Sequence, residues 1–504
     1  MKFTLAERPA YGTKSSMAVL LILFYFTLLL YVGCSGGNSN GNQLVLARVE
    51  VPDYLEDIHL PVYADLEDGQ EIYYALVIAT KEELDQAGVT YRIIDSYIPG
   101  TRYIIAQEEI EGARKEAANV VDILYDDGEH IIVRFKADLT ELLPDLGFDI
   151  KLMSKTQINV MQDGVSSSAK LALSANSISS FEKNSDVEKM IAAVTQTDIK
   201  DWTDHLSGEK QVEVNGNLIT LTSRHTYQQG TQVQNATQYV YDQMKAMGIG
   251  VSFSEWSVAY GEGTLDNRNV VGEIKGKTTP NEIVVLIAHL DTISKNENGI
   301  EPGADDNASG CVGLLAAADI MRYYSFNRTV RFVFTTGEEQ SLYGGTAYAE
   351  KMDSEEQNIV AVLNLDMIGY SKITDPAVKP KQQIKIRNQK NKTGHAKDLP
   401  IAQTYIDVVN TYGMHQTFDA IIEDDGESTS DHAPFWDLMA TCLKRNPTAS
   451  CYPAAWIIEY AEEGYLNPKM HSAEDRVSNM NLPYFTAIVK AALGTAAHLA
   501  QPTR

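Results

Sequence analysis

The chain has 504 residues, of which 44% are hydrophobic and 22% charged, a composition typical of a globular protein rather than a disordered one. This length exceeds what one ordinary hydrophobic core can serve, so we expect two or three folded units. The formal net charge of −26 would repel phosphate groups, which argues against nucleic acid as a main partner.

The N-terminal segment resembles a bacterial lipoprotein signal. Basic residues at positions 2, 8 and 14 precede an uncharged apolar run over residues 17–32, which is shorter than the roughly 20 residues a membrane-spanning helix needs. Cys34 follows and opens a tether rich in Gly, Asn and Ser. The resemblance implies a signal peptide over residues 1–33, lipid on the Cys34 thiol and a tether over residues 34–48. The protein would then be exported and anchored to the lipid bilayer at the cell envelope, in the periplasm or at the outer membrane of a bacterium. An uncleaved membrane anchor is the alternative.

Residues 49–160 contain two similar patterns and predict a small accessory α+β domain. Residues 71–95 and 130–154 each begin with a run of β-branched and aromatic residues, which predicts a strand. A pattern typical of a short helix that ends near a glycine follows, and then a second strand pattern. Two such units suggest a doubled split βαβ arrangement. The Ser-rich residues 161–185 are predicted to be a linker.

From residue 186 to the C-terminus, apolar runs of four to eight residues alternate with helical patterns. This alternation predicts an α/β domain with a mostly parallel central sheet and helices on both faces. In such sheets ligands bind beyond the carboxyl ends of the strands, so functional side chains are expected where apolar runs stop.

Acidic and imidazole side chains do follow the ends of these runs. They are His289 and Asp291, Asp305 and Asp306, Glu338 and Glu339, Asp366, and later His471 and Asp475. Imidazoles with carboxylates are a ligand set that suits Zn²⁺, and several carboxylates at close range need a cation to stay ionised. Five ligands with one bridging carboxylate would hold two ions about 3.5–4 Å apart and leave one glutamate to act as a general base.

On these motifs residues 186–499 resemble the co-catalytic dizinc exopeptidases, a family of bacterial leucyl-type aminopeptidases with glutamate carboxypeptidase and glutaminyl cyclase relatives. The matching motifs are His289-Leu290-Asp291, Gly303 to Gly310, Gly337-Glu338-Glu339, Leu365-Asp366-Met367, Ser430-Asp431-His432, and His471 with Asp475. The resemblance implies two zinc ions bridged by Asp305, with His289 and Asp366 at one ion and Glu339 and His471 at the other. It makes Glu338 the general base and acid, has Asp291 orient His289, and gives Asp475 a similar place near His471.

The implied activity is a zinc-dependent exopeptidase acting on peptides, with an aminopeptidase favoured. The substrate-binding candidates are Met367, Ile368, Glu459 and Tyr460, with Ala454, Trp456 and Tyr465 as further pocket walls. The alternatives are a carboxypeptidase, a glutaminyl cyclase and a non-catalytic binding module. Asp431 and His432 are expected to line the site without binding metal. Cys442 and Cys451 bracket a short polar loop and either form a local disulfide or stay free, whereas Cys311 is expected to be a buried thiol.

Overall fold

The computed structural model covers the whole chain and places residues 41–504 in one compact unit. It describes residues 43–503 except 71, 111, 160–180, 228–231, 261–262, 294–298, 374, 376 and 463. Cys34, the apolar run over residues 17–32 and most of the predicted linker lie outside the described residues. No helix among the described residues has both the length and the apolar character needed to cross a membrane.

The N-terminal part consists of two four-stranded antiparallel sheets. In each sheet, one strand lies between the two strands of a strand–helix–strand unit. In the first sheet, of order β2-β3-β1-β4, β1 lies between β3 and β4; in the second, of order β6-β7-β5-β8, β5 lies between β7 and β8. The strands are β1 (Leu44–Glu50), β2 (Val62–Glu67), β3 (Tyr73–Thr80), β4 (Tyr91–Ser96), β5 (Tyr103–Glu108), β6 (Ile123–Asp126), β7 (His130–Arg134) and β8 (Phe148–Leu152). The predicted pair of split βαβ units is therefore confirmed.

Local sequence signals fix the helices of these units. Helix α1 (Lys81–Ala87) begins at a capping box, in which the Glu83 amide donates to the Thr80 hydroxyl and the Thr80 amide donates to the Glu83 carboxylate. It ends at Gly88, whose φ of 66° favours glycine. Helix α3 (Leu139–Leu146) ends in the same way at Gly147, and α2 (Ala113–Ala117) is a single short turn.

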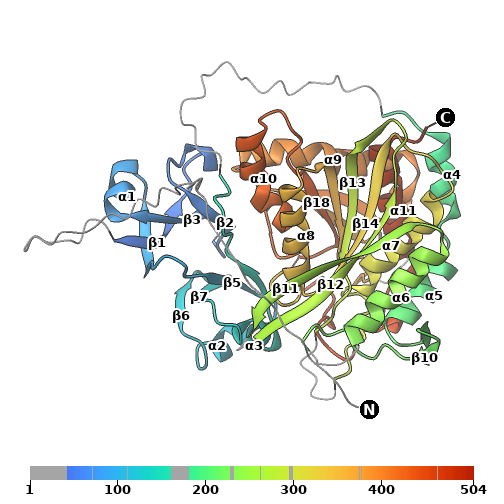
Figure 1. Cartoon of the computed structure of the whole chain (residues 1–504), viewed down its shortest axis with the longest axis horizontal. Coiled ribbons are helices and arrows are strands. Elements are labelled where there is room, and N and C mark those ends of the chain that lie inside the picture. The colour runs from blue at the N-terminus through green and yellow to red at the C-terminus, as the bar shows by residue number, and fades with distance from the viewer. Residues whose placement is uncertain are drawn as a thin grey trace, which may run out of the picture. The chain divides into compact units, whose positions relative to one another are not determined.

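The C-terminal part is built on an eight-stranded sheet of order β11-β12-β14-β13-β15-β18-β16-β17 (Figure 1). Its strands are β11 (Gly250–Tyr260), β12 (Gly263–Ile274), β13 (Thr279–His289), β14 (Arg328–Thr335), β15 (Asn358–Leu365), β16 (Lys381–Lys385), β17 (Asp419–Glu423) and β18 (Ala454–Glu459). Four of the seven neighbouring pairs are parallel, and these include the central β14-β13-β15-β18 run. Antiparallel pairs occur between β11, β12 and β14 and between β16 and β18. The predicted mostly parallel α/β sheet is confirmed.

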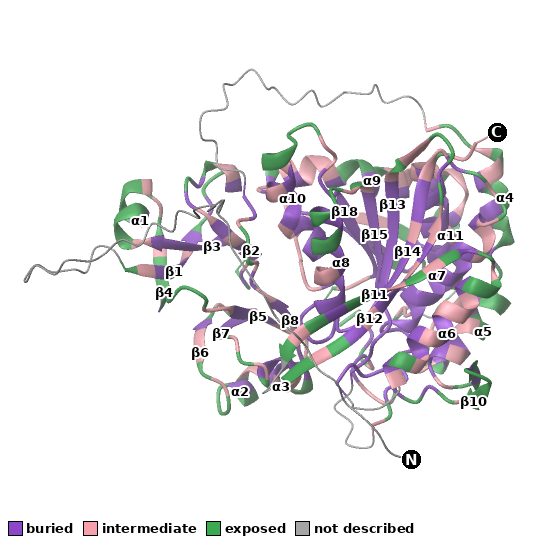
Figure 2. Cartoon of the chain, in the orientation of Figure 1, coloured by how far each residue is buried: buried purple, intermediate pink, exposed green. Residues whose placement is uncertain are grey.

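Helices cover both faces of this sheet, as Figure 1 shows with α8 on one side and α7 on the other. Alternate residues of β13 divide between two hydrophobic cores: Val284, Leu286 and Ala288 enter the larger core, and Ile283, Val285 and Ile287 enter the core under α8 and α10. The buried central strands stand out in Figure 2. The helices are α4 (Ser185–Ala193), α5 (Gln196–Leu206), α6 (Gln232–Ala246), α7 (Ala308–Met321), α8 (Tyr343–Ser354), α9 (Lys392–Thr411), α10 (Ala433–Arg445) and α11 (Leu482–Ala500), and a hairpin joins β9 (Val212–Val214) to β10 (Asn217–Ile219).

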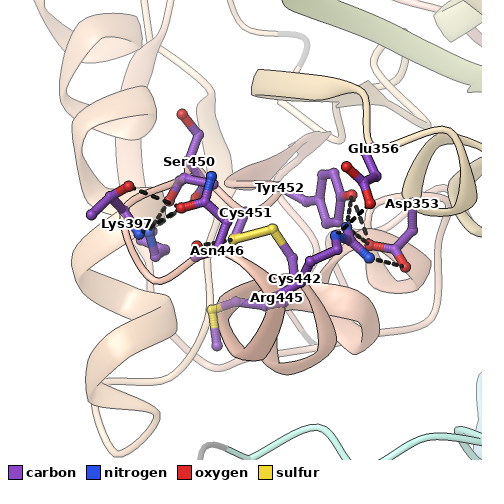
Figure 3. Close-up of a disulfide and its surroundings, with 12 residues drawn as sticks. Asp353, Glu356, Lys397, Cys442, Arg445, Asn446, Ser450, Cys451 and Tyr452 are labelled. Atoms are coloured by element: carbon purple, nitrogen blue, oxygen red, sulfur yellow. Dashed lines mark hydrogen bonds and ion pairs between the residues drawn. A yellow bond between two sulfur atoms is a disulfide. The ribbon is translucent and has the colours of Figure 1, made fainter.

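Cys442 and Cys451 form a disulfide between the end of α10 and the approach to β18 (Figure 3). The Arg445 guanidinium beside it binds the Asp353 carboxylate, and the amine of Lys397 donates to the carbonyls of Ala449 and Ser450. Closing so short a loop contributes on the order of 2–3 kcal/mol in a chain-entropy account. Cys311 is a buried free thiol, as predicted.

Candidate metal centre

Three neighbouring parallel strands end at the same edge of the sheet and bring the predicted side chains together. β13 ends at His289, which lies opposite Thr335, the last residue of β14, while β15 ends just before Asp366. Glu338 and Glu339 follow β14 within four residues. The loop before α7 and the loop after β18 add the remaining acidic and imidazole groups to this edge.

The Asp306 carboxylate lies between two imidazoles. Asp306 Oδ1 is 3.2 Å from His289 Nε2, and Asp306 Oδ2 is 3.0 Å from His471 Nε2. His289 Nε2 is also 3.2 Å from Asp366 Oδ1, and His471 Nε2 is 3.1 Å from Glu339 Oε2. The cluster therefore consists of two imidazole–carboxylate pairs that share Asp306.

This geometry corrects one sequence assignment, because Asp306 rather than Asp305 takes the bridging position. Asp305 Oδ1 accepts a hydrogen bond from the Gly369 amide at 2.7 Å, and Asp305 Oδ2 accepts one from the Asn467 side-chain amide at 3.0 Å. Both oxygens of Asp305 are thus used inside the protein, away from the imidazoles.

The loop that carries Asp306 is held from two sides. The Asp475 carboxylate accepts hydrogen bonds from the amides of Asp305 and Asp306, at 3.1 and 3.0 Å. Asp475 therefore positions this loop rather than His471, beside which we expected it. Buried Arg224 donates to the carbonyls of Leu290, Leu206, Pro302 and Gly303. It thereby ties the end of β13 to the start of the same loop.

The electrostatics of the cluster follow from its burial. Burial tends to raise the pKa of Asp306, but its hydrogen bonds to His289 and His471 hold that pKa well below the usual range. Burial tends to lower the pKa of His289, yet Asp366 and Glu338 hold it well above its ordinary value. Without a metal ion, protons on the imidazoles would supply the positive charge that the carboxylates need.

These residues fit a metal site. His289, Glu338 and Asp366 form one group whose ligand atoms lie within 4.8 Å of one another, and His289, Asp306 and Glu339 form a second. Glu339 Oε1 and His471 Nδ1 are buried without a hydrogen-bond partner among the described residues. Nitrogen and oxygen donors of this kind suit zinc.

Glu338 belongs to the first of these groups but lies outside the two imidazole–carboxylate pairs that share Asp306. Its Oε2 is 3.9 Å from His289 Nε2, which is farther than either Asp306 or Asp366. Burial, followed by the nearby charges of Asp366 and Glu339, raises the pKa of Glu338 well above its usual value, although His289 opposes this. A carboxylate with a raised pKa can take up a proton and return it.

Asp291 supports the site in a different way from that predicted. The His289 Nδ1 atom is 3.2 Å from the main-chain carbonyl of Asp291, and 3.9 Å from its carboxylate. The Asp291 carboxylate instead accepts hydrogen bonds from the Glu338 amide and the Thr226 hydroxyl, at 3.4 and 3.2 Å. Its main chain thus orients the imidazole, while its side chain fixes the backbone of Glu338.

A cavity of about 290 Å³ opens onto the cluster, and only some of the predicted substrate-binding residues line it. Met367 and Trp456 line it, together with Ile458 and Met470, with which they form an apolar cluster. The other predicted wall residues do not border this cavity: Ile368, Glu459, Tyr460, Ala454 and Tyr465.

Their own contacts explain why three of these residues lie away from the cavity. Glu459 is 1% exposed, and its carboxylate accepts hydrogen bonds from the amides of Tyr370 and Asn467. Ile368 is fully buried in the larger core. Tyr460 borders another hollow, where its hydroxyl accepts a hydrogen bond from Lys381.

His432 and Asp431 lie close to the cluster without joining it, as predicted. The His432 ring stacks on Trp456 with ring centroids 5.2 Å apart, and burial lowers its pKa to about 3. The Asp431 carboxylate accepts a hydrogen bond from the Thr335 hydroxyl. Both residues therefore pack behind the site.

Sequence reasoning missed several groups at the cavity. Glu109, Asp149 and Lys151 come from the N-terminal part, Lys385 is the last residue of β16, and Glu427 follows β17. None of these residues belongs to a recognisable motif. For the bridging position, the one signal in the sequence was that Asp305 is followed directly by a second aspartate, Asp306.

Comparison with known proteins identifies this half of the chain. Residues 269–496 match the model of the peptidase family M28. Residues 269–496 therefore resemble the peptidases of family M28. The matched segment contains every residue of the metal cluster, from His289 to His471. Over this segment, the predicted resemblance to a zinc metallopeptidase family is confirmed.

Similar proteins include fungal aminopeptidases. Leucine aminopeptidase 2 of Trichophyton equinum is 38% identical over 102 residues, which cover 20% of this chain and 19% of that protein. Leucine aminopeptidase 1 of Ajellomyces dermatitidis is 26% identical over 302 residues, which cover 56% of this chain and 69% of that protein. This chain therefore matches about a fifth of the length of the first relative and about two thirds of the second.

Solved structures with a similar fold include two proteins of one bacterium. The LapA aminopeptidase of Legionella pneumophila superposes with a TM-score of 0.56 at 19% identity, covering 81% of this chain and 100% of its own. LapB of Legionella pneumophila superposes with a TM-score of 0.53 at 16% identity, covering 79% and 99%. Both overlaps exceed what residues 186–504 provide alone, so the likeness in fold extends into the N-terminal part.

Proposed function

We propose that this chain is a zinc-dependent aminopeptidase that holds two zinc ions and removes N-terminal residues from peptides. The observation that carries the proposal is the Asp306 carboxylate, which has one oxygen at each imidazole. One ion would be held by His289, Asp306 and Asp366, and the other by His471, Asp306 and Glu339. The names of the aminopeptidase relatives support the same activity.

The residues of the chain take separate roles in this reaction. Bound zinc would supply Lewis-acid chemistry, polarising the peptide carbonyl and making a water molecule more acidic. The Glu338 carboxylate would accept the proton of the attacking water and later donate it to the departing amine. The apolar wall of Met367, Trp456, Ile458 and Met470 would hold the first side chain of the substrate.

The charges around the cavity favour an aminopeptidase over a carboxypeptidase. Among the described residues that line the cavity, the two lysines are already in ion pairs, Lys151 with Asp437, and Lys385 with Asp425 and Glu427. A carboxypeptidase would need a free cation for the carboxylate of its substrate, whereas an aminopeptidase needs acidic groups for an amine.

Removal of metal tests this function. Treatment with a chelator should abolish hydrolysis of leucyl p-nitroanilide, and two equivalents of zinc per chain should restore it. N-acetyl-leucyl p-nitroanilide, a blocked carboxypeptidase substrate and a peptide with N-terminal glutamine serve as controls and should show no turnover. Cleavage of the acetylated substrate or of the carboxypeptidase substrate, or cyclisation of the glutamine, would replace the aminopeptidase assignment. Full activity in metal-free protein would end the zinc assignment.

We also propose that the chain is exported and held at the bacterial cell envelope by lipid on Cys34. The support is the basic N-terminus, the short apolar run of residues 17–32 and the position of Cys34 before a polar tether. When the chain is produced in a bacterium fed with an alkyne-labelled fatty acid, it should become labelled and sediment with membranes, whereas Cys34→Ala should carry no label. Membrane association without any label in the unaltered chain would instead indicate an uncleaved anchor.

A further inference from the structure

Part of the cavity at the metal centre is walled by the N-terminal half of the chain. Strand β8 contributes Asp149 and Lys151, and the segment after β5 contributes Glu109. Side chains alternate along a strand, so Phe148 and Ile150 of β8 enter the core of this half while Asp149 and Lys151 face the cavity.

Hydrogen bonds hold this wall in place against the peptidase half. Lys151 Nζ donates to Asp437 Oδ1 of α10 at 3.1 Å, and the Thr140 and Tyr227 hydroxyls are 2.6 Å apart. The Leu55 amide donates to the Lys390 carbonyl at 2.8 Å. Polar contacts from the segments that form both N-terminal sheets thus fix the position of the wall against the peptidase half.

Glu109 and Asp149 differ from the other acidic groups at the cavity. Among the described residues, neither carboxylate has a hydrogen-bond or ion-pair partner, although both border the cavity. The other acidic lining residues outside the metal cluster each accept a hydrogen bond or form an ion pair: Asp65, Glu67, Glu129, Asp425, Glu427 and Glu462. His130, which also borders the cavity, has its Nδ1 atom 3.6 Å from the Asp127 carboxylate.

The lining of the cavity carries more acidic than basic side chains, and Glu109 and Asp149 are the acids of this lining, outside the metal cluster, that have neither a hydrogen bond nor an ion pair among the described residues. Two zinc ions would offset the four carboxylates of Asp306, Glu338, Glu339 and Asp366. The two lysines at the cavity form ion pairs with Asp437, Asp425 and Glu427, and no ion pair of Glu109 or Asp149 occurs among the described residues. A cation from the substrate would complete the balance.

A buried and unpartnered polar atom faces the same cavity. Glu339 is 7% exposed and borders the cavity, and its Oε1 has no hydrogen-bond partner among the described residues. Burial, and then the charge of Glu109, raises the pKa of Asp149, while the charges of His471 and Glu339 also act on it. Asp149, Glu339 and His471 line the same cavity.

We propose that Glu109 and Asp149 form a subsite for a primary ammonium group of the substrate. The N-terminal part would thus complete the binding site of the C-terminal part. The ammonium group has two possible sources, the α-amine of the peptide and the side chain of an N-terminal lysine. This inference rests on the proposed aminopeptidase function.

The test uses the full zinc-loaded chain with Glu109→Gln, Asp149→Asn and the double variant. Glu82→Gln is the matched control, because Glu82 is an exposed acid of α1 in the same half and does not border the cavity. Calorimetry gives the ratio of dissociation constants for leucine hydroxamate and 4-methylpentanohydroxamate, which differ only in the α-amine. Turnover gives the ratio of kcat/KM for lysyl and norleucyl p-nitroanilide, which differ only in the side-chain ammonium.

We take the hydroxamate ratio as the dissociation constant of 4-methylpentanohydroxamate divided by that of leucine hydroxamate. We expect the double variant to lower this ratio, the substrate ratio or both by about 10-fold, the size of a charge-assisted contact, and the control to leave both within about 2-fold. A fall in the hydroxamate ratio assigns the subsite to the α-amine, and a fall in the substrate ratio assigns it to a lysine side chain. Unchanged ratios in the folded double variant, or in both single variants if the double variant does not fold, overturn the inference. If the unaltered chain hydrolyses neither substrate, the aminopeptidase proposal fails, and the calorimetric ratio still decides whether the subsite exists.

Discussion

Glu338→Gln should leave the chain folded and zinc-loaded but lower kcat for leucyl p-nitroanilide by about 1000-fold or more. Glutamine has the shape of glutamate but cannot accept the proton of the attacking water, and general-base catalysis contributes about 10²–10⁴-fold. Glu338 Oε2 is 3.9 Å from His289 Nε2, farther than the metal-ligand candidates, so the zinc content should not change. Elemental analysis and steady-state kinetics on the same preparation measure both quantities.

The neighbouring glutamate provides the control for this variant. Glu339 Oε2 lies 3.1 Å from His471 Nε2, within the cluster, so Glu339→Gln should lose zinc as well as activity. Retained turnover in zinc-loaded Glu338→Gln would remove Glu338 from the reaction. Loss of zinc in Glu338→Gln would make Glu338 a ligand instead of a base.

Asp306→Asn should lower the zinc content from two ions per chain towards none, whereas Asp305→Asn should keep its zinc. The Asp306 carboxylate meets both imidazoles, and asparagine at this position removes one of its two anionic oxygens and the charge that both sites share. Asp305 contacts the Gly369 amide and the Asn467 side chain instead. Metal analysis of the two variants, purified side by side, distinguishes these adjacent residues.

A stability measurement makes the same comparison sharper. In Asp305→Asn the new amide would face the donating amide of Asn467, and an unsatisfied buried polar group costs about 1–3 kcal/mol. We therefore expect Asp305→Asn to lower the unfolding temperature while it still binds zinc. The reverse pattern, with zinc lost from Asp305→Asn and kept by Asp306→Asn, would restore Asp305 as the bridge.

The sequence alone determined the elements of the fold and the edge at which the chemistry lies. Runs of β-branched and aromatic residues and glycine-terminated helices predicted both split βαβ units, including the ends of their helices near Gly88 and Gly147. The rule that ligands bind beyond parallel strand ends predicted that His289, Glu339 and Asp366 would meet. These predictions succeed because strand and helix formation depend on local side-chain patterns, and because neighbouring parallel strands end at one edge.

Only the tertiary structure decided what each side chain contacts at that edge. Asp305 and Asp306 are adjacent and chemically alike, and partners more than 50 residues away, Gly369, Asn467 and Asp475, settle which of them faces the imidazoles. Glu459 was predicted to line the pocket, but its carboxylate accepts hydrogen bonds from backbone amides in the interior. Glu109 and Asp149 reach the cavity through the packing of one half of the chain on the other, and such packing depends on the shapes of whole surfaces, which no short stretch of sequence records.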